Sequence, residues 1–348
     1  MPDNAEKRDE LDAIPPGWSY NPASWSQRIP IVILAFVGGI MAFYLTLFQW
    51  NVVRTIWEPF FAGPPGYENG SARILKSPTS EIFPWPLTDG FLGFLGYVFD
   101  AIFGLIGGVK RWRTMPWVVI IFGLLVGPLG AVSIGLVITQ PLAYDTFCTL
   151  CVGTAIVSVL MIGPAMDEML ASLQYMRLVK QRGLPFWKYF WGRGEQEYLH
   201  ESGLPDHPGG VRLEGPEREA VKRRRGVAIG GQVIVALVGV YLMFAPWLLD
   251  YDGAPEKIDR FIGPLVASFA TMAAWEVLRN VRWINLLLAI VLALLVISPW
   301  PWAHPGRVIA SDLISAALII GFTLLPYPAL RGYGGGWPAA WRSTRRAR

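Results

Sequence analysis

Cysteine and histidine are scarce in this sequence of 348 residues. The chain contains two cysteines, Cys148 and Cys151, and three histidines, His200, His207 and His304. Two cysteines exclude a small fold that is held together by several disulfides. A zinc site normally takes four ligands, and the histidines are far from the cysteines in the chain, so we expect no metal site. Covalent haem attachment is also excluded, because Val152 stands where a histidine would be needed.

Charge is scarce as well. Charged residues make up 16% of the chain, whereas hydrophobic residues make up 53%. This balance is typical of a membrane protein. The net charge of +4 is small, and no basic stripe with interleaved aromatic side chains occurs, so we expect no nucleic-acid partner. Residues 1–26 contain acids, bases and prolines and lack the features of a cleaved secretory signal.

Eight hydrophobic segments reach or approach the length that crosses a bilayer, which is about 20 apolar residues for a core of about 30 Å. They are 29–50, 91–108, 117–136 and 147–166 in the first half, and 227–249, 261–277, 284–300 and 308–325 in the second. The sequence therefore predicts an all-α polytopic membrane protein with about eight transmembrane helices, arranged as two four-helix bundles.

Basic residues in the connections predict the orientation, because Lys and Arg resist translocation. They collect at 110–113, 177–225 and 279–282 and in the C-terminal tail, whereas 140–146 and 250–259 contain few. An eight-helix arrangement puts all the basic connections on one side. We expect that side to be the cytoplasm, with both termini in it.

The same pattern divides the chain into five parts. They are a cytoplasmic tail at 1–26, a four-helix domain at 27–176, a cytoplasmic linker at 177–224, a second four-helix domain at 225–330 and a basic cytoplasmic tail at 331–348. An interfacial helix is expected at 167–182, and a flexible segment is expected at 192–216.

The cysteine pair is the main chemical feature of the sequence. Cys148 and Cys151 open the fourth predicted span, for which Asp145 or Thr146 is the expected N-cap. Residues three apart share a helix face, so the sulfurs are able to form a disulfide or to act in thiol exchange. The amides of the first turn favour Cys148 as the attacking thiolate. The alternative is that both cysteines are small packing residues in an apolar helix.

Two stretches resemble the vitamin K epoxide reductase family of membrane thiol oxidoreductases. Phe-Cys-Thr-Leu-Cys-Val-Gly-Thr-Ala at 147–155 resembles the family's active-site motif at the start of its fourth helix. Ser-Ala-Arg-Ile-Leu-Lys-Ser at 71–77, followed by 83–93 and Tyr97, is similar to the family's outside loop and second helix. The resemblance covers roughly 24–176, about half of the chain.

The resemblance implies a four-helix bundle in which Cys148 and Cys151 exchange electrons with a quinone of the ubiquinone or menaquinone type. Ser77 matches the family's serine in the loop helix, and Asp89 stands where the family usually has an asparagine near the quinone head group. In the family, a second cysteine pair in the loop passes electrons from a thioredoxin-like partner. Here Ser71 replaces the second loop cysteine and 51–88 contains no cysteine, so this shuttle pair is missing.

The second half contains an internal repeat. Ala-Pro-Trp at 245–247 and Ser-Pro-Trp at 298–300 close the fifth and seventh predicted spans and are similar to the SPW repeat, a two-span bacterial membrane unit. The proline is expected to end the helix, and the indole is expected to anchor it at headgroup depth. We expect this half to have no catalytic role and to associate with the first bundle, with lipid or with another membrane subunit.

Two functional hypotheses remain open. The first is a quinone-linked thiol-disulfide oxidoreductase on the extracytoplasmic face of a bacterial inner (cytoplasmic) membrane, with a thioredoxin-like protein as partner. The second is a non-enzymatic membrane scaffold or accessory subunit that keeps the fold without the full cysteine relay. Asp100 and Asp312 are further candidates because ionisable residues in spans are usually functional, although Asp312 is expected near the outer interface.

Overall fold

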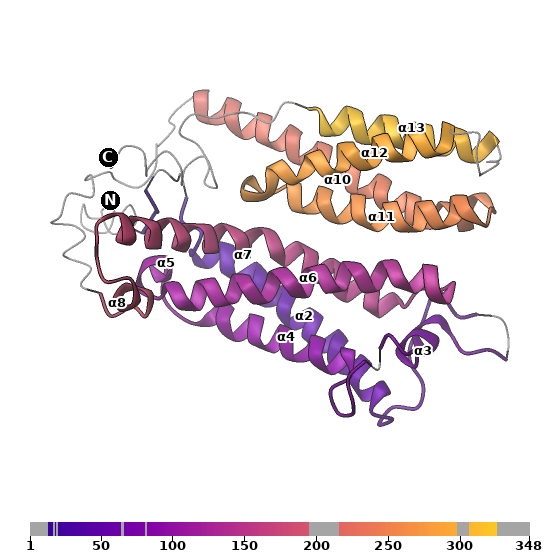
Figure 1. Cartoon of the computed structure of the whole chain (residues 1–348), viewed down its shortest axis with the longest axis horizontal. Coiled ribbons are helices and arrows are strands. Elements are labelled where there is room, and N and C mark those ends of the chain that lie inside the picture. Colours follow the sequence, from indigo (N-terminus) through magenta and orange to yellow (C-terminus); the bar gives the residue numbers. More distant parts are fainter. Residues whose placement is uncertain are drawn as a thin grey trace.

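The computed structural model describes residues 13–16, 18, 20–63, 66–80, 82–194, 216–297 and 306–325. These residues form helices and contain no strand, which confirms the all-α prediction. The long helices run side by side in two groups, one from each half of the chain (Figure 1). The tail predicted at 331–348 lies outside the described residues.

The first group, which we call the N-terminal bundle, contains four long helices. They are α2 (Trp25–Gln49), α4 (Asp89–Leu105), α6 (Pro116–Tyr144) and α7 (Thr149–Gln181). The short helix α3 (Gly70–Leu75) lies at one end of this bundle, and α5 (Arg111–Thr114) and α8 (Phe186–Phe190) lie at the other (Figure 1). We call these the motif end and the basic end.

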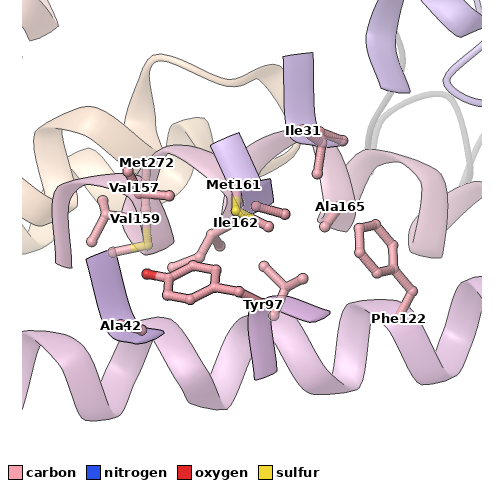
Figure 2. Packing of buried hydrophobic residues seen from close by; sticks show 12 residues of the cluster. Ile31, Ala42, Tyr97, Phe122, Val157, Val159, Met161, Ile162, Ala165 and Met272 are labelled. Atoms are coloured by element: carbon pink, nitrogen blue, oxygen red, sulfur yellow. The ribbon is translucent and has the colours of Figure 1, made fainter. Parts of the chain in front are cut away.

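The core of the N-terminal bundle is formed where apolar side chains from all four long helices meet. Ile31, Tyr97, Phe122 and Met161 are buried together between these helices (Figure 2). The Tyr97 ring passes so close to Gly38 that a Cβ there would lie 2.6 Å from the ring. The small residue therefore lets α2 and α4 approach closely, as is common between membrane helices.

Buried charges hold the basic end together. Arg111 of α5 forms a fully buried ion pair with Glu168 of α7. The fully buried guanidinium of Arg28 donates hydrogen bonds to the carbonyl oxygens of Gly104 and Ile106, where α4 ends. A cation at this position satisfies carbonyl groups that have no partner within the helix.

The described part of the expected N-terminal tail is packed against the bundle. Trp18 is fully buried, and its Nε1–H donates to Oε1 of Gln174 at 2.7 Å. The hydroxyl of Tyr20 donates to Oδ2 of Asp167 at 2.6 Å. This segment therefore closes the basic end.

The second group, which we call the C-terminal bundle, also contains four helices. They are α10 (Pro216–Leu249), α11 (Ala254–Ala273), α12 (Arg282–Ile297) and α13 (Gly306–Thr323), with the 3-10 helix η1 (Glu276–Val281) before α12. A Cβ on Gly239 of α10 would lie 2.7 Å from the carbonyl oxygen of Gly263 in α11. These two helices therefore cross with their backbones in near contact.

The two bundles pack against each other. Helix α11 contacts α6 and α7, and the indole of Trp275 covers Gly163 of α7. At the motif end, the ring of Phe244 in α10 lies 5.4 Å from the ring of Phe147 and 6.2 Å from that of Phe61, measured between centroids. The second half of the chain thus reaches the segment directly before the cysteine pair.

Six helical segments of the described residues are long and apolar enough to cross a membrane. The two other predicted spans correspond to α4, which has 17 residues, and to α11, whose first turns contain charged residues. The count of eight therefore remains a prediction.

Three details of the predicted helices are wrong. The helix expected at 167–182 is not a separate interfacial helix, because α7 continues without a break to Gln181. The sixth span was expected to reach Val277, whereas α11 ends at Ala273. Pro246 does not end its helix, because α10 continues to Leu249; the proline removes one backbone N–H from the last turn.

Replacing Gly163 with alanine tests the contact between the bundles. A Cβ there would lie 2.1 Å from the Trp275 ring, so the indole must move, and overpacking of this kind costs about 1–3 kcal/mol. We expect Gly163→Ala to lower the thermal unfolding temperature of the purified protein in detergent. Gly135→Ala is the matched control, since no heavy atom lies within 4 Å of its new Cβ. Equal unfolding temperatures for the two variants would contradict this packing.

Candidate functional site

The two cysteines form a disulfide at the first turn of α7, and their Cα atoms are 5.2 Å apart. Cys148 is itself the N-cap of this helix, and the backbone N–H of Cys151 donates to its Sγ at 3.1 Å. The prediction that Asp145 or Thr146 caps the helix is therefore wrong. Asp145 instead ends α6, with a φ of 50° that turns the chain into the motif.

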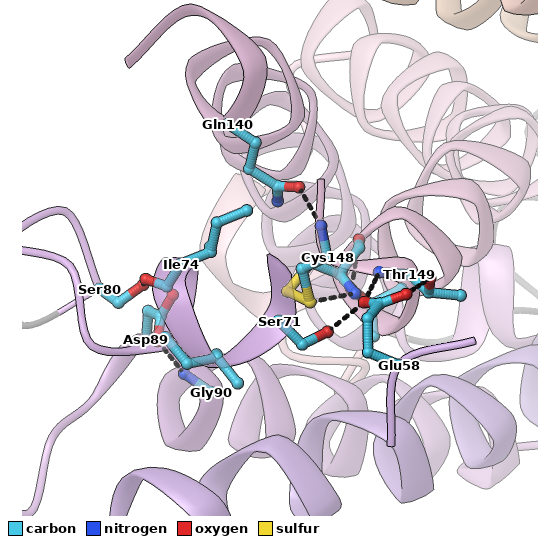
Figure 3. The surroundings of a disulfide bond; sticks show 12 residues. Glu58, Ser71, Ile74, Ser80, Asp89, Gly90, Gln140, Cys148 and Thr149 are labelled. Carbon is cyan, nitrogen blue, oxygen red and sulfur yellow. Dashed lines mark hydrogen bonds between the residues drawn. A yellow bond between two sulfur atoms is a disulfide. The ribbon is translucent and has the colours of Figure 1, made fainter. Parts of the chain in front are cut away.

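A carboxylate that the sequence analysis did not single out binds the start of α7. Glu58 lies in the loop after α2 and accepts a hydrogen bond from the Thr149 backbone N–H at 2.9 Å, and another from the Thr149 hydroxyl (Figure 3). It also accepts from the Ser71 hydroxyl of α3. An acceptor at the first turn satisfies a free N–H and interacts favourably with the helix dipole. We call this set of contacts the Glu58 clamp.

The Glu58 clamp favours the ionised carboxylate. Partial burial pushes the pKa of Glu58 upward, but the hydrogen bonds from Ser71, Thr149 and the backbone of Phe61 outweigh burial, and the net pKa is lowered. The carboxylate is therefore charged at neutral pH.

The clamp holds α3 and its loop over Cys148. The side chain of Cys148 is fully buried and packs with Leu45, Ile74 and Leu75. A Cβ on Gly70 would lie 2.2 Å from the carbonyl oxygen of Phe147, so α3 touches the backbone directly before the motif. A protein outside the bundle therefore reaches the sulfur of Cys148 only if this loop moves.

Cys151 lines a cavity of about 450 Å³ whose walls are mostly apolar, whereas Cys148 is not among the lining residues. The cavity lies between α4, α6 and α7 and is covered by the segment after α3. Gln140 lies at its wall and accepts the backbone N–H of Cys148 at 3.0 Å. The volume is within the usual range for a site that binds a small organic molecule.

The predicted cofactor residues differ in their positions. Asp89 lines the cavity, accepting hydrogen bonds from the Gln49 side-chain amide and from the backbone of Gly90. Ser77 is buried and is not among the residues that line the cavity; its Oγ lies 2.8 Å from Oγ1 of Thr79, which does line it. The structure thus brings Asp89 and Cys151 to one cavity and leaves Ser77 behind its wall.

Hydroxyl groups line a deeper part of the same cavity. The Tyr97 hydroxyl donates to the carbonyl oxygen of Thr154 at 2.7 Å and lies 2.7 Å from Oγ of Ser158. Ser133 lies 3.3 Å from the same Ser158 oxygen. Asp100, one turn beyond Tyr97 on α4, also lines the cavity and is fully buried.

Asp312 is buried inside the C-terminal bundle, where Tyr251 donates a hydrogen bond to another buried acid, Asp259. Its expected position near the outer interface stays a prediction. Across the part of the chain that the structure describes, no group of three or more His, Cys, Asp or Glu side chains is placed to hold a metal ion. All three histidines lie outside that part.

A comparison with known protein families gives a match within the N-terminal bundle. Residues 29–165 match the sequence model of the Vitamin K epoxide reductase family. No curated protein and no solved structure matches the chain. The matched stretch is less than half of the chain and contains the cysteine pair, Glu58 and the residues that line the cavity, so a stretch similar to this family lies within the N-terminal bundle. The family consists of membrane helical bundles that use quinones in redox reactions, which supports a general function in membrane thiol-disulfide chemistry.

Removing the Glu58 carboxylate tests whether the clamp covers Cys148. In protein carrying Cys151→Ser, we expect Glu58→Ala to raise the rate of Cys148 alkylation by a water-soluble maleimide at least about tenfold, because the cover of α3 loses its main contact with α7. Glu68→Ala is the matched control, since Glu68 lies in the same loop and forms only an exposed ion pair with Lys76. Equal rates for Glu58→Ala and Glu68→Ala would contradict the clamp.

The clamp also predicts a pH dependence. Because the pKa of Glu58 is lowered from its ordinary value of 4.5, its stabilising contribution is fully present above that value and is lost as the pH falls through the lowered pKa. The difference in unfolding temperature between the wild-type protein and Glu58→Gln should be constant above about pH 5.5 and shrink towards pH 3. A difference that stays constant or grows on acidification would contradict this assignment.

Proposed function

We propose that this protein is a quinone-linked membrane thiol-disulfide oxidoreductase whose redox pair is Cys148 and Cys151. The observation that carries the proposal is the position of Cys151, which forms a disulfide with Cys148 and at the same time lines a largely apolar cavity. A lipid-soluble oxidant in this cavity lies directly beside one sulfur of the pair.

The two sulfurs then have different roles. In the dithiol state, the N–H of Cys151 and the start of α7 favour the thiolate form of Cys148. Cys151 faces the oxidant. Oxidation of the dithiol by a quinone gives a disulfide and a hydroquinone: two electrons leave the sulfurs, and the two thiol protons are balanced by two protons taken up at the quinone oxygens.

Residues near Cys151 fit a quinone head group. Asp89 and Gln140 line the cavity at the motif end: the Gln140 amide is able to donate to a quinone carbonyl oxygen, and Asp89 is able to accept from a hydroquinone hydroxyl. Leucine side chains from α4 and α6 provide an apolar surface. Asp89 is already engaged by Gln49, so it accepts hydrogen bonds where an asparagine amide would also donate one. The type of quinone, ubiquinone or menaquinone, is left open.

The missing loop cysteines give the reductant a direct role. Ser71 stands at the position of the second loop cysteine and its hydroxyl is bound by Glu58, so the loop holds a hydrogen bond where the family has a thiol. We propose that a thioredoxin-like protein on the extracytoplasmic face displaces the clamp and attacks Cys148. Its own dithiol is then oxidised to a disulfide as the Cys148–Cys151 bond is reduced.

We propose that the C-terminal bundle, with its SPW-type repeats, supports the redox domain and binds lipid or another membrane subunit. The contacts of Phe244 with Phe61 and Phe147 favour the supporting role, and the strongly exposed Trp247 suits an anchor at the lipid surface. The repeat at 298–300 lies outside the described residues. With the basic end in the cytoplasm of a bacterial cell, the motif end faces outward.

The full burial of Cys148 favours a second candidate function. A disulfide that is covered by a clamped loop, in a chain without loop cysteines, is also what a static bond in a scaffold or accessory subunit requires. Oxidation of the cysteine pair by quinone, tested next, separates the two functions.

Quinone-dependent oxidation of the cysteine pair is the decisive test. We expect the reduced protein in lipid nanodiscs to re-form its disulfide within minutes of adding a short-chain ubiquinone or menaquinone, and to stay reduced in quinone-free nanodiscs without oxygen. Loss of the gel shift caused by a maleimide-linked polymer measures the change. In cells, Cys151→Ser should trap a mixed disulfide at Cys148, and Cys148→Ser is the control that should not.

An unchanged thiol content after quinone addition, together with full biological activity of Cys148→Ala/Cys151→Ala, would establish the accessory-subunit function instead.

A further inference from the structure

One buried acid in the cavity has no role in the exchange of electrons described above. Asp100 of α4 is fully buried and lines the same cavity as Cys151. Neither of its carboxyl oxygens has a hydrogen-bond partner among the described residues. A buried polar group without a partner costs free energy, and such groups in membrane spans are usually functional.

Asp100 is exceptional among the polar residues of the cavity. Every other polar side chain that lines it is already engaged: the described residues provide a hydrogen bond or, for Cys151, a disulfide. The engaged residues are Thr79, Ser80, Asp89, Tyr97, Ser133, Thr139, Gln140, Tyr144, Cys151 and Thr154. Asp100 is therefore the lining residue whose polar atoms all lack a partner among the described residues.

The position of Asp100 is opposite to that of Cys151. Both α4 and α7 begin at the motif end, and Asp100 lies 11 residues after Asp89, which corresponds to about 16 Å along a helix. Tyr97, between these two acids, reaches Thr154, one turn deeper than Cys151. Cys151 and Asp100 therefore line the cavity on the shallow and the deep side of the Tyr97 hydroxyl.

We propose that Asp100 binds the quinone by hydrogen-bonding to the head-group oxygen that points away from Cys151. The inference rests on the proposed function for the identity of the ligand. A carboxylic acid offers one donor and one acceptor, so it donates to the carbonyl oxygen of the quinone and accepts from the hydroxyl of the hydroquinone. Asp100 thus satisfies both redox forms, and binding removes its own lack of a partner.

The experiment uses quinone-induced stabilisation, which does not depend on electron transfer. The full-length protein with its disulfide intact is heated in detergent with and without a saturating one-isoprene ubiquinone, and the same series is run with a one-isoprene menaquinone. We expect the quinone to raise the unfolding temperature of the wild-type protein and of Asp100→Asn, which keeps a donor and an acceptor. We expect Asp100→Leu to lose most of this shift and to bind quinone at least about tenfold more weakly, since an unmet hydrogen bond costs about 1–3 kcal/mol.

The quinone-free unfolding temperature separates a ligand contact from a structural one. Because Asp100 has no partner in the bundle, Asp100→Leu should be as stable as the wild-type protein or more stable without quinone, since leucine leaves no unpaired polar atom. Asp312→Leu is the matched control: it removes another buried acid with an unpartnered oxygen, in the C-terminal bundle, and should keep the full quinone shift.

A quinone shift of equal size in the wild-type protein and Asp100→Leu would overturn the inference, as would the absence of a shift in the wild-type protein. A quinone shift that depends on Asp100, together with a dithiol that the quinone does not oxidise, would overturn the redox function and leave the binding role intact. A quinone shift of equal size in the wild-type protein and Asp100→Leu, together with rapid oxidation of the dithiol by quinone, would overturn the binding role of Asp100 and leave the redox function intact.

Discussion

The contact between the Glu58 carboxylate and the first turn of α7 determines the arrangement of the whole motif end. One side chain binds the Thr149 amide, the Thr149 hydroxyl and the Ser71 hydroxyl, so it connects the loop after α2, helix α3 and the redox motif. Because these donors surround the carboxylate, it stays charged and the loop stays closed. The burial of Cys148 follows from this contact.

The clamp gives the disulfide two different faces. Cys148 is buried in an apolar cluster beneath α3, which Glu58 connects to α7, whereas Cys151 lies at the wall of a largely apolar cavity. A single disulfide is therefore placed between two environments. The proposed function uses this placement: the protein partner would attack Cys148, and the quinone would meet Cys151 in the cavity.

The remainder of the chain holds this arrangement rigid. The buried pair of Arg111 and Glu168 fixes the basic end, far from the motif, and Trp275 packs over Gly163 midway along α7. Phe244 completes an aromatic contact with the loop and the motif. A helix that carries a reactive pair at one end is thus supported along its length by both halves of the chain, which suits a site that needs fixed geometry.

The sequence by itself determined the helical membrane class, the two groups of helices, the family that the first group resembles and the closeness of Cys148 to Cys151, because hydrophobic run length and a spacing of three residues are local signals. Only the tertiary structure revealed Glu58 and decided which face of the motif meets the cavity. Glu58 lies 91 residues from Thr149 in the chain, and no local pattern encodes a contact over that distance. Asp100 was visible as a charge in a span, but its lack of a partner depends on what α6 and α7 place around it.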